Sequence, residues 1–266
     1  MARLILPQPN ERQRLFLTAD NKYIAFGGAR GGGKSWSVRF KAIMLALNYP
    51  GIRICIIRKT YPELRSNHID ELRKVLHGIA RYTDTSKEFK FANGSVIACR
   101  YCQTEKDLGK FQGIQFDIEF IDEATHFTEA MYDQIKACVR GVNNFPKRIY
   151  LTCNPGGVGH IWVKRLFLDR AYRHGEDPSE YTFIKSLVTD NKALLESNPD
   201  YIKQLEALPP KLRKAWLEGD WNVYEGQFFE EFLDDSDHYE DRKHTHVITP
   251  FEILKQTYYL LLIVEK

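Results

Sequence analysis

The sequence predicts an α/β fold in which a parallel sheet is flanked by helices and followed by a small helical subdomain. Short apolar runs typical of buried strands alternate with amphipathic helices as far as about residue 154, and this alternation is typical of parallel sheets with helical cover. From about Ile161 onward the pattern is mostly helical. A chain of 266 residues, of which 43% are hydrophobic, is long and apolar enough to bury the core of such a fold.

Periodicity and glycine or proline punctuation give the first elements. Residues 23–28, YIAFGG, predict a short buried strand, and residues 34–49 predict a helix. A second strand is expected at 52–59, followed by a helix from about Glu63 to Ile79. In the first of these helices five apolar residues fall at helical spacing: Trp36, Phe40, Ile43, Met44 and Leu47.

The alternation continues through the middle of the chain. Asn93-Gly94, between two alternating runs, predicts a β-hairpin. A buried strand at 116–122 precedes a helix at about 129–139, and residues 148–154 predict a further strand. Later in the chain, Pro209-Pro210 is expected to separate two short helices.

Charge and hydropathy place few limits on function. A formal net charge of +3 permits a polyanionic partner without requiring one. The amino-terminal apolar stretch is too short for a signal peptide, and the longest apolar run, residues 258–264, is too short to span a membrane. We therefore expect a cytoplasmic protein without membrane association.

The glycine-rich loop after the first strand carries the strongest chemical signal. It fits the phosphate-binding pattern G-x-x-x-x-G-K-[ST] and lies between a predicted strand and a predicted helix. Its N–H groups would bind the phosphates of ATP, Lys34 would reach the β and γ phosphates, and Ser35 would bind Mg²⁺. The alternative is a glycine-rich turn without a ligand. The predicted nucleotide-binding residues of the loop are Gly28, Ala29, Arg30, Gly31, Gly32, Gly33, Lys34 and Ser35.

Two adjacent carboxylates follow the strand predicted at 116–122. Asp122 and Glu123 come at its carboxyl end, the edge at which open α/β sheets bind ligands. Asp122 would hold Mg²⁺, and Glu123 would orient and deprotonate the attacking water, as in ATPases. The alternative is that the pair only caps the helix that follows.

Polar residues also end the strand predicted at 148–154. Thr152 and Asn154 would lie beside the γ-phosphate and sense whether it is present, unless Asn154 only caps the proline-glycine turn behind it. Gln13 precedes Gly28 by 15 residues and could reach the base, whereas spacing alone favours a solvated helical glutamine.

The phosphate loop and the Asp122–Glu123 pair together predict the fold class of a P-loop NTPase of the ASCE, RecA-like type. We predict a P-loop ATPase core at residues 1–175. A helical lid subdomain and the start of a linker are expected at 176–235, and residues 236–266 continue the linker.

Six segments, in this order, resemble the large terminase subunit of tailed bacteriophages. They are NERQRLFL, GGARGGGKS, IRKTYPELR, FIDEATHF, TCNPGG and LEGDWNVYEGQFF. The likeness extends to about Pro250, and the ARGGGKS loop and the late GDW followed by EGQFF are its specific parts. The Asp-Glu pair is shared with many motor ATPases.

The resemblance implies an ATPase motor that packages viral double-stranded DNA into a procapsid in the cytoplasm of the bacterial host. It implies that Gln13 contacts adenine, that Arg30 is a charge-stabilising finger, and that Thr152 to Asn154 form the coupling motif. Arg30 could instead fold back onto an acidic neighbour and hold the loop's shape. A portal protein, a small terminase subunit and a homo-oligomeric ring on the procapsid are the implied partners. In the segment KFQGIQFD, relatives often carry an arginine just before the glycine. This chain has Gln112 there, with Lys110 nearby.

Large terminases continue into a nuclease domain similar to RNase H. The segment TYYLLLIVEK resembles its first strand but lacks the Asp of the two-metal site, so we expect 236–266 to hold a truncated start of that domain and no nuclease activity. The basic residues of IRKTYPELR and WVKRLFLDRAYRH could contact DNA phosphates or form solvated helix faces. Two other functions stay open: a helicase-like, nucleic-acid-remodelling ATPase, and an inactive nucleotide-binding prophage remnant.

Overall fold

An eight-stranded sheet organises residues 7–223, the part of the chain that the computed structural model describes. The strand order is β3-β4-β5-β2-β6-β7-β1-β8. The strands are β1 (Tyr23–Gly28), β2 (Arg53–Arg58), β3 (Ala80–Thr83), β4 (Glu88–Phe91), β5 (Val96–Tyr101), β6 (Ile118–Ile121), β7 (Arg148–Cys153) and β8 (Tyr181–Ser186).

The sheet is parallel from β5 to β8, as the alternating pattern predicts. The predicted hairpin is confirmed: β4 and β5 pair antiparallel, with Phe89 opposite Ile97. Gly94 in the connecting turn has a φ of 85°, a left-handed conformation that glycine adopts without strain. Strand β3, which the sequence did not predict, pairs antiparallel with β4 at the edge.

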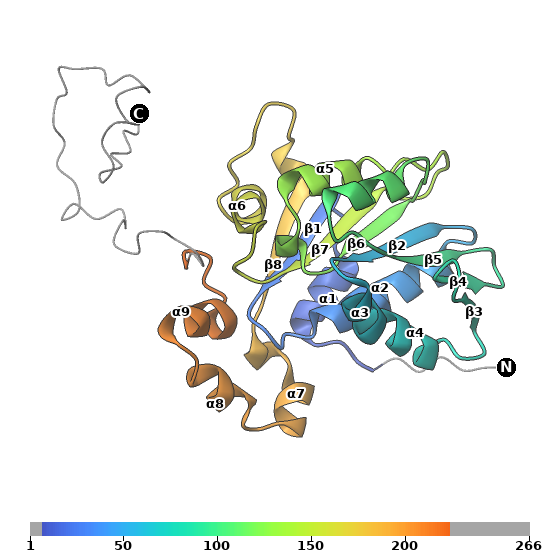
Figure 1. Cartoon of the computed structure of the whole chain (residues 1–266). Coiled ribbons are helices and arrows are strands. Elements are labelled where there is room, and N and C mark those ends of the chain that lie inside the picture. Colours follow the sequence, from blue (N-terminus) through green and yellow to red (C-terminus); the bar gives the residue numbers. More distant parts are fainter. Residues whose placement is uncertain (1–6, 224–266) are drawn as a thin grey trace, which may run out of the picture. The chain divides into compact units, whose positions relative to one another are not determined.

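Helices cover both faces of the sheet (Figure 1). Figure 1 shows α1 (Glu11–Thr18), α2 (Lys34–Asn48), α3 (Tyr61–Leu64) and α4 (Asp70–Val75) on one face, and α5 (Glu129–Lys136) and α6 (His160–Val163) on the other. Two buried apolar clusters match these layers. One joins Phe16 and Ile43 to Phe120, and the other joins Tyr132 and Trp162 to Ile121.

Helix α2 begins at Lys34 as predicted, but its buried face differs from the predicted one. Ile43 is buried, whereas Leu47 is 44% exposed. Much of the buried face consists of small residues, Ala42 and Ala46 among them, which let the helix approach the sheet closely. Trp36, also predicted for this face, is only partly covered.

The helix predicted from Glu63 to Ile79 is shorter and interrupted. It starts earlier, at Tyr61, because Pro62 fits the first turn of a helix. A π-helical turn, Arg65–Ile69, separates α3 from α4, which ends at Val75.

The sheet extends past the core boundary predicted at residue 175, because β8 pairs in parallel with β1 along its whole length. The sequence YTFIKS at this sheet edge has neither a continuous apolar run nor strict alternation, so the prediction of a mostly helical region missed this strand. Three short helices follow: α7 (Lys192–Ser197), α8 (Tyr201–Glu206) and α9 (Pro210–Arg213). The predicted break at Pro209-Pro210 is confirmed.

The rest of the predicted lid, the linker and the nuclease-like strand lie at residues 224–266, outside the described part of the chain. No helix within residues 7–223 combines the length and the apolar character needed to cross a membrane.

Candidate functional site

The order of the strands brings the predicted site residues to one edge of the sheet. Strand β7 lies between β1 and β6, and all three run parallel. The phosphate loop after β1, the Asp122–Glu123 pair after β6 and Asn154 after β7 therefore emerge side by side.

The backbone of the loop is shaped to face an anion. Gly33 precedes α2 with a φ of 76°, and a Cβ there would approach Gln13 Nε2 to 2.5 Å, so only glycine fits. Within the described residues, the amides of Gly31, Gly32 and Gly33 donate no hydrogen bond to the protein. Free amide donors at the positive end of a helix are suited to binding an anion such as phosphate.

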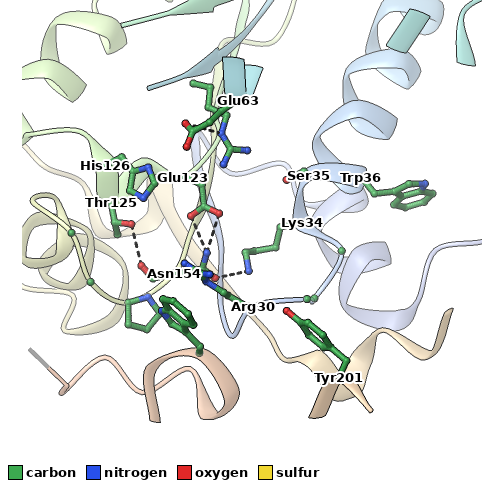
Figure 2. Close-up of a pocket in the computed structure, with 18 residues that line it drawn as sticks. Arg30, Lys34, Ser35, Trp36, Glu63, Glu123, Thr125, His126, Asn154 and Tyr201 are labelled. Atoms are coloured by element: carbon green, nitrogen blue, oxygen red, sulfur yellow. Dashed lines mark hydrogen bonds and ion pairs between the residues drawn. The ribbon is translucent and has the colours of Figure 1, made fainter. Parts of the chain in front are cut away.

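A pocket of about 550 Å³ opens in front of this loop, within the range of small-molecule sites (Figure 2). It is lined by loop residues, by the strand ends and by the helical segment after β8: Arg30, Gly31, Gly32, Gly33, Lys34, Ser35, Trp36, Arg58, Glu63, Glu123, Thr125, His126, Asn154, Pro155, Gly156, Gly157, Tyr201 and Trp216.

Lys34 reaches from the start of α2 into the centre of the site. Its Nζ donates to the Ala29 carbonyl at 2.6 Å and to Asn154 Oδ1 at 2.8 Å. Burial lowers the pKa of Lys34, while the carboxylates of Glu123 and Asp122 act against that shift. The carbonyl and the amide hold the ammonium group beside the loop.

Asp122 is fully buried beneath the pocket rather than lining it. Its Oδ1 accepts from Thr152 Oγ1 at 2.5 Å, and its Oδ2 accepts from Arg58 Nη1 at 2.6 Å and from His68 Nε2 at 2.8 Å. Burial opposes ionisation of this carboxyl, but His68 and Arg58 overcome it and hold the pKa of Asp122 well below its usual range. Asp122 is therefore a carboxylate at neutral pH.

Ser35 and Asp122 fit a magnesium ion that is shared with a nucleotide. Ser35 Oγ lies 3.4 Å from Asp122 Oδ2, and a hydroxyl with a carboxylate is the oxygen donor set that Mg²⁺ prefers. Within residues 7–223, no group of three or more His, Cys, Asp or Glu side chains could hold a metal ion. The remaining ligands of a cation here would be phosphate oxygens and water.

Glu123 projects into the pocket from a left-handed backbone with a φ of 58°, unusual for a residue with a side chain. Its amide donates to Thr152 Oγ1 at 3.0 Å. Its side chain makes no capping hydrogen bond to the short 3₁₀ turn Ala124–His126, and Thr128 caps α5 instead. The helix-cap alternative for Glu123 is therefore wrong.

Asn154 connects the two sides of the pocket (Figure 2). Its Nδ2 donates to Glu123 Oε1 at 3.0 Å and to Oε2 at 2.8 Å, while its Oδ1 accepts from Lys34. The side chain is thus engaged across the site and does not cap the turn behind it. In that turn, the Gly156 amide donates to His160 Nδ1.

Gln13 is buried against the phosphate loop, so the solvated alternative is wrong. It belongs to a capping box with Asn10 at the start of α1, and its Nε2 donates to the Gly33 carbonyl at 3.3 Å. Gln13 itself does not line the pocket.

Arg30 lies at the rim of the pocket and stacks on an aromatic ring. Its guanidinium carbon is 3.2 Å from the ring centroid of Trp216, and its amide donates to the Trp216 carbonyl at 2.8 Å. No acidic side chain of the described residues pairs with Arg30, so the alternative of a fold-back onto an acid is not observed.

Both basic segments considered for DNA have arginines that pair with acidic side chains of the protein. Arg58 of IRKTYPELR is buried on Asp122. Arg165 pairs with Glu129 and Glu176, both at 2.8 Å, and Arg173 pairs with Glu129. The charge of Arg58 is thus engaged by Asp122, and those of Arg165 and Arg173 by Glu129 and Glu176, while contact of these segments with DNA stays a prediction.

Comparison with known proteins identifies the family. The family model described as phage terminase large subunit matches residues 20–220. This chain belongs to that family. No protein of curated function matches the sequence.

Solved large terminases share the fold. The large terminase of a thermophilic bacteriophage matches with a TM-score of 0.66 at 19% identity, over 81% of this chain and 54% of that one. A structure of the same terminase in complex with ATP-gamma-S matches with a TM-score of 0.64 at 19% identity, over 80% and 53%. The ATPase domain of the Thermus phage P74-26 large terminase matches with a TM-score of 0.60 at 14% identity, over 80% and 94%. The chain thus spans about half the length of the first terminase and most of the P74-26 ATPase domain.

Sequence reasoning missed several residues of this terminase site. Arg58 follows a buried apolar run at the carboxyl end of β2, the same signal that singled out Asp122. His68 and Trp216 carry no such signal, because each reaches the site from a helical turn whose position depends on packing.

Proposed function

We propose that the chain is the ATP-hydrolysing part of a viral DNA-packaging motor, in which hydrolysis drives translocation of double-stranded DNA into a procapsid. The contact that carries the proposal is the Asn154 bridge between Lys34 and Glu123. It holds a lysine and a glutamate together in one pocket of a terminase-family chain, which supports a role in phosphate binding for Lys34 and in activation of water for Glu123.

The nucleotide-binding residues are the loop from Gly28 to Ser35. Lys34 neutralises the β and γ phosphates, and the loop amides bind their oxygens. Gln13 supports the loop through Gly33, and we propose that it also contacts adenine. Arg30 leaves the Trp216 ring to stabilise charge on the transferring phosphoryl group.

Hydrolysis needs a cation, a base and an attacking water. Ser35 and Asp122 would hold Mg²⁺, which neutralises charge on the phosphates. Glu123 orients and deprotonates the water, and Asn154 fixes the direction of its carboxylate. Thr152 of β7 contacts both the Asp122 carboxylate and the Glu123 amide. A movement of one acid can therefore be transmitted to the other through β7.

The partners follow from family likeness. We propose that the chain acts on double-stranded DNA in the bacterial host cytoplasm, as a homo-oligomeric ring with a portal protein and a small terminase subunit. The family assignment favours this function over a general helicase.

Steady-state ATP hydrolysis, measured with and without duplex DNA, tests the proposal. We expect Mg²⁺-dependent turnover that duplex DNA raises and that Glu123→Gln lowers by about 10²–10⁴-fold. Glu105→Gln, an exposed glutamate outside the pocket, is the matched control and should hydrolyse at the parental rate. A hydrolysis rate that changes neither on addition of duplex DNA nor on substitution of Glu123 would contradict the motor function.

A further inference from the structure

The carboxylate of Asp122 is fully engaged by the protein. One oxygen accepts from Thr152, and the other accepts from Arg58 at 2.6 Å and His68 at 2.8 Å. Ser35 Oγ approaches both carboxylate oxygens, at 3.5 Å from Oδ1 and 3.4 Å from Oδ2. A divalent cation held by Ser35 and Asp122 would therefore bind a carboxylate that the Arg58 guanidinium already occupies.

A divalent cation and a guanidinium cannot share one carboxylate without an electrostatic penalty. A cation and a guanidinium bound to the same carboxylate repel each other more strongly inside a protein than in bulk water. The second charge of a divalent ion doubles this repulsion. The Arg58 side chain is only 10% exposed, so water screens little of this repulsion. Binding of the cation would favour a different position for the guanidinium.

A second carboxylate lies within reach of Arg58. Its Nε is 3.6 Å from Glu63 Oε2, and both residues line the pocket. Figure 2 labels Glu63. Neither Arg58 Nε nor Glu63 Oε2 has a hydrogen-bond partner in the described residues, although both atoms are buried. Buried polar atoms without partners are rare, so this pair has unused capacity for a charge-assisted hydrogen bond.

We propose that Arg58 and the divalent cation compete for Asp122, and that Arg58 passes from Asp122 to Glu63 when the cation binds. Arg58 is then a positioning residue that keeps the acid ionised and in place, and makes tight cation binding depend on the nucleotide. The phosphates supply the extra ligands that let the cation displace the guanidinium. The inference rests on the proposed function, because it needs a nucleotide-dependent cation at Ser35 and Asp122.

Binding of Mn²⁺ alone tests the competition, with free Mn²⁺ measured by electron paramagnetic resonance. We expect weak binding to the parent chain without nucleotide, and binding at least about tenfold tighter to Arg58→Met, which keeps the bulk of the side chain but loses its charge. Arg53→Met, at the exposed start of the same strand, is the matched control and should bind Mn²⁺ like the parent. Arg58→Gln is the second variant if the Met protein does not fold, with the same expected direction.

The second carboxylate is tested in the presence of ADP. Glu63→Gln should weaken Mn²⁺ binding to the ADP complex several-fold, because the displaced guanidinium loses its charged acceptor, while binding of Mn²⁺ alone stays weak. If neither Arg58→Met nor Arg58→Gln binds Mn²⁺ alone more tightly than the parent does, the inference is overturned. If the parent itself fails to bind Mn²⁺ with ADP, the proposed function fails instead, so the two failures are distinguishable.

Discussion

The side-chain amide of Asn154 joins Lys34 to Glu123. Its oxygen accepts from the lysine ammonium at 2.8 Å, and its nitrogen donates to the glutamate at 2.8 and 3.0 Å. The two ends of one rigid amide thus set the position of the Lys34 ammonium relative to the Glu123 carboxylate. Movement of either partner changes the hydrogen bond of the other.

Asn154→Asp tests this bridge. The aspartate cannot donate to Glu123 and places a second negative charge beside it, so hydrolysis should fall by about 10²-fold as for a disturbed general base. Lys34 keeps its acceptor, and the ATP affinity should change less. Single-turnover hydrolysis and calorimetric binding measure the two effects, with the exposed Asn144→Asp as control. An unchanged hydrolysis rate would remove the bridge from the mechanism.

Lys34→Ala should abolish useful ATP binding. The buried site then loses the side chain that neutralises the β and γ phosphate oxygens, and the loop amides alone do not replace a full charge. Isothermal titration calorimetry measures the affinity. ATP binding as tight as that of the parent would show that the phosphate-loop assignment is wrong.

Glu123→Gln should separate binding from chemistry. The amide still accepts a hydrogen bond from Asn154 but cannot take a proton, so hydrolysis should fall by about 10²–10⁴-fold. ATP and Mg²⁺ binding should remain within a few-fold of the parent. Loss of nucleotide affinity in step with the rate would instead indicate a structural role for Glu123.

Arg30→Ala should slow hydrolysis by about 10³-fold or more if the guanidinium acts as an arginine finger, with much of the ATP affinity retained. Arg30→Lys should rescue poorly, because an ammonium lacks the planar fork and stacks less well on Trp216. Single-turnover rates at saturating ATP are the measurement. If Arg30→Ala hydrolyses ATP at the parental rate, Arg30 has no catalytic role and only Glu123 keeps one.

Glu119 should make the stability of the protein depend on pH. It is fully buried in β6, neither carboxylate oxygen has a hydrogen-bond partner in the described residues, and burial raises its pKa well above the usual 4.5. The titratable groups that face it, Cys55, Tyr132 and Cys138, stay neutral because burial raises the pKa of each as well.

The folded protein therefore holds the Glu119 proton more tightly than the unfolded chain does. The stabilisation is complete below about pH 4.5 and falls as the pH rises towards the folded-state pKa, by up to about 1.4 kcal/mol per pH unit. Glu119→Gln removes this term, so its advantage in melting temperature over the parent should be larger at about pH 8 than at about pH 5. Glu105→Gln is the control, and an equal difference at both pH values would contradict the assignment.

The sequence by itself determined the features that depend on local pattern. The glycines before Lys34 and Ser35 predict a phosphate loop, because a predicted strand precedes them and a predicted helix follows them. Alternating runs around Asn93-Gly94 predict a hairpin. Acids after the buried run that ends at Ile121 predict a site at the sheet edge. Each of these signals lies within a few residues, and backbone sterics and hydrophobic burial act at that range.

Only the tertiary structure decided which side chains meet. The sheet order puts β7 between β1 and β6, so that Asn154 reaches both Lys34 and Glu123. Packing of a π-helical turn brings His68 to Asp122, and β8 joins the sheet although its own sequence pattern does not predict a strand. Such contacts join segments far apart in the chain, and their energies come from burial and hydrogen bonds that exist only after the layers have packed.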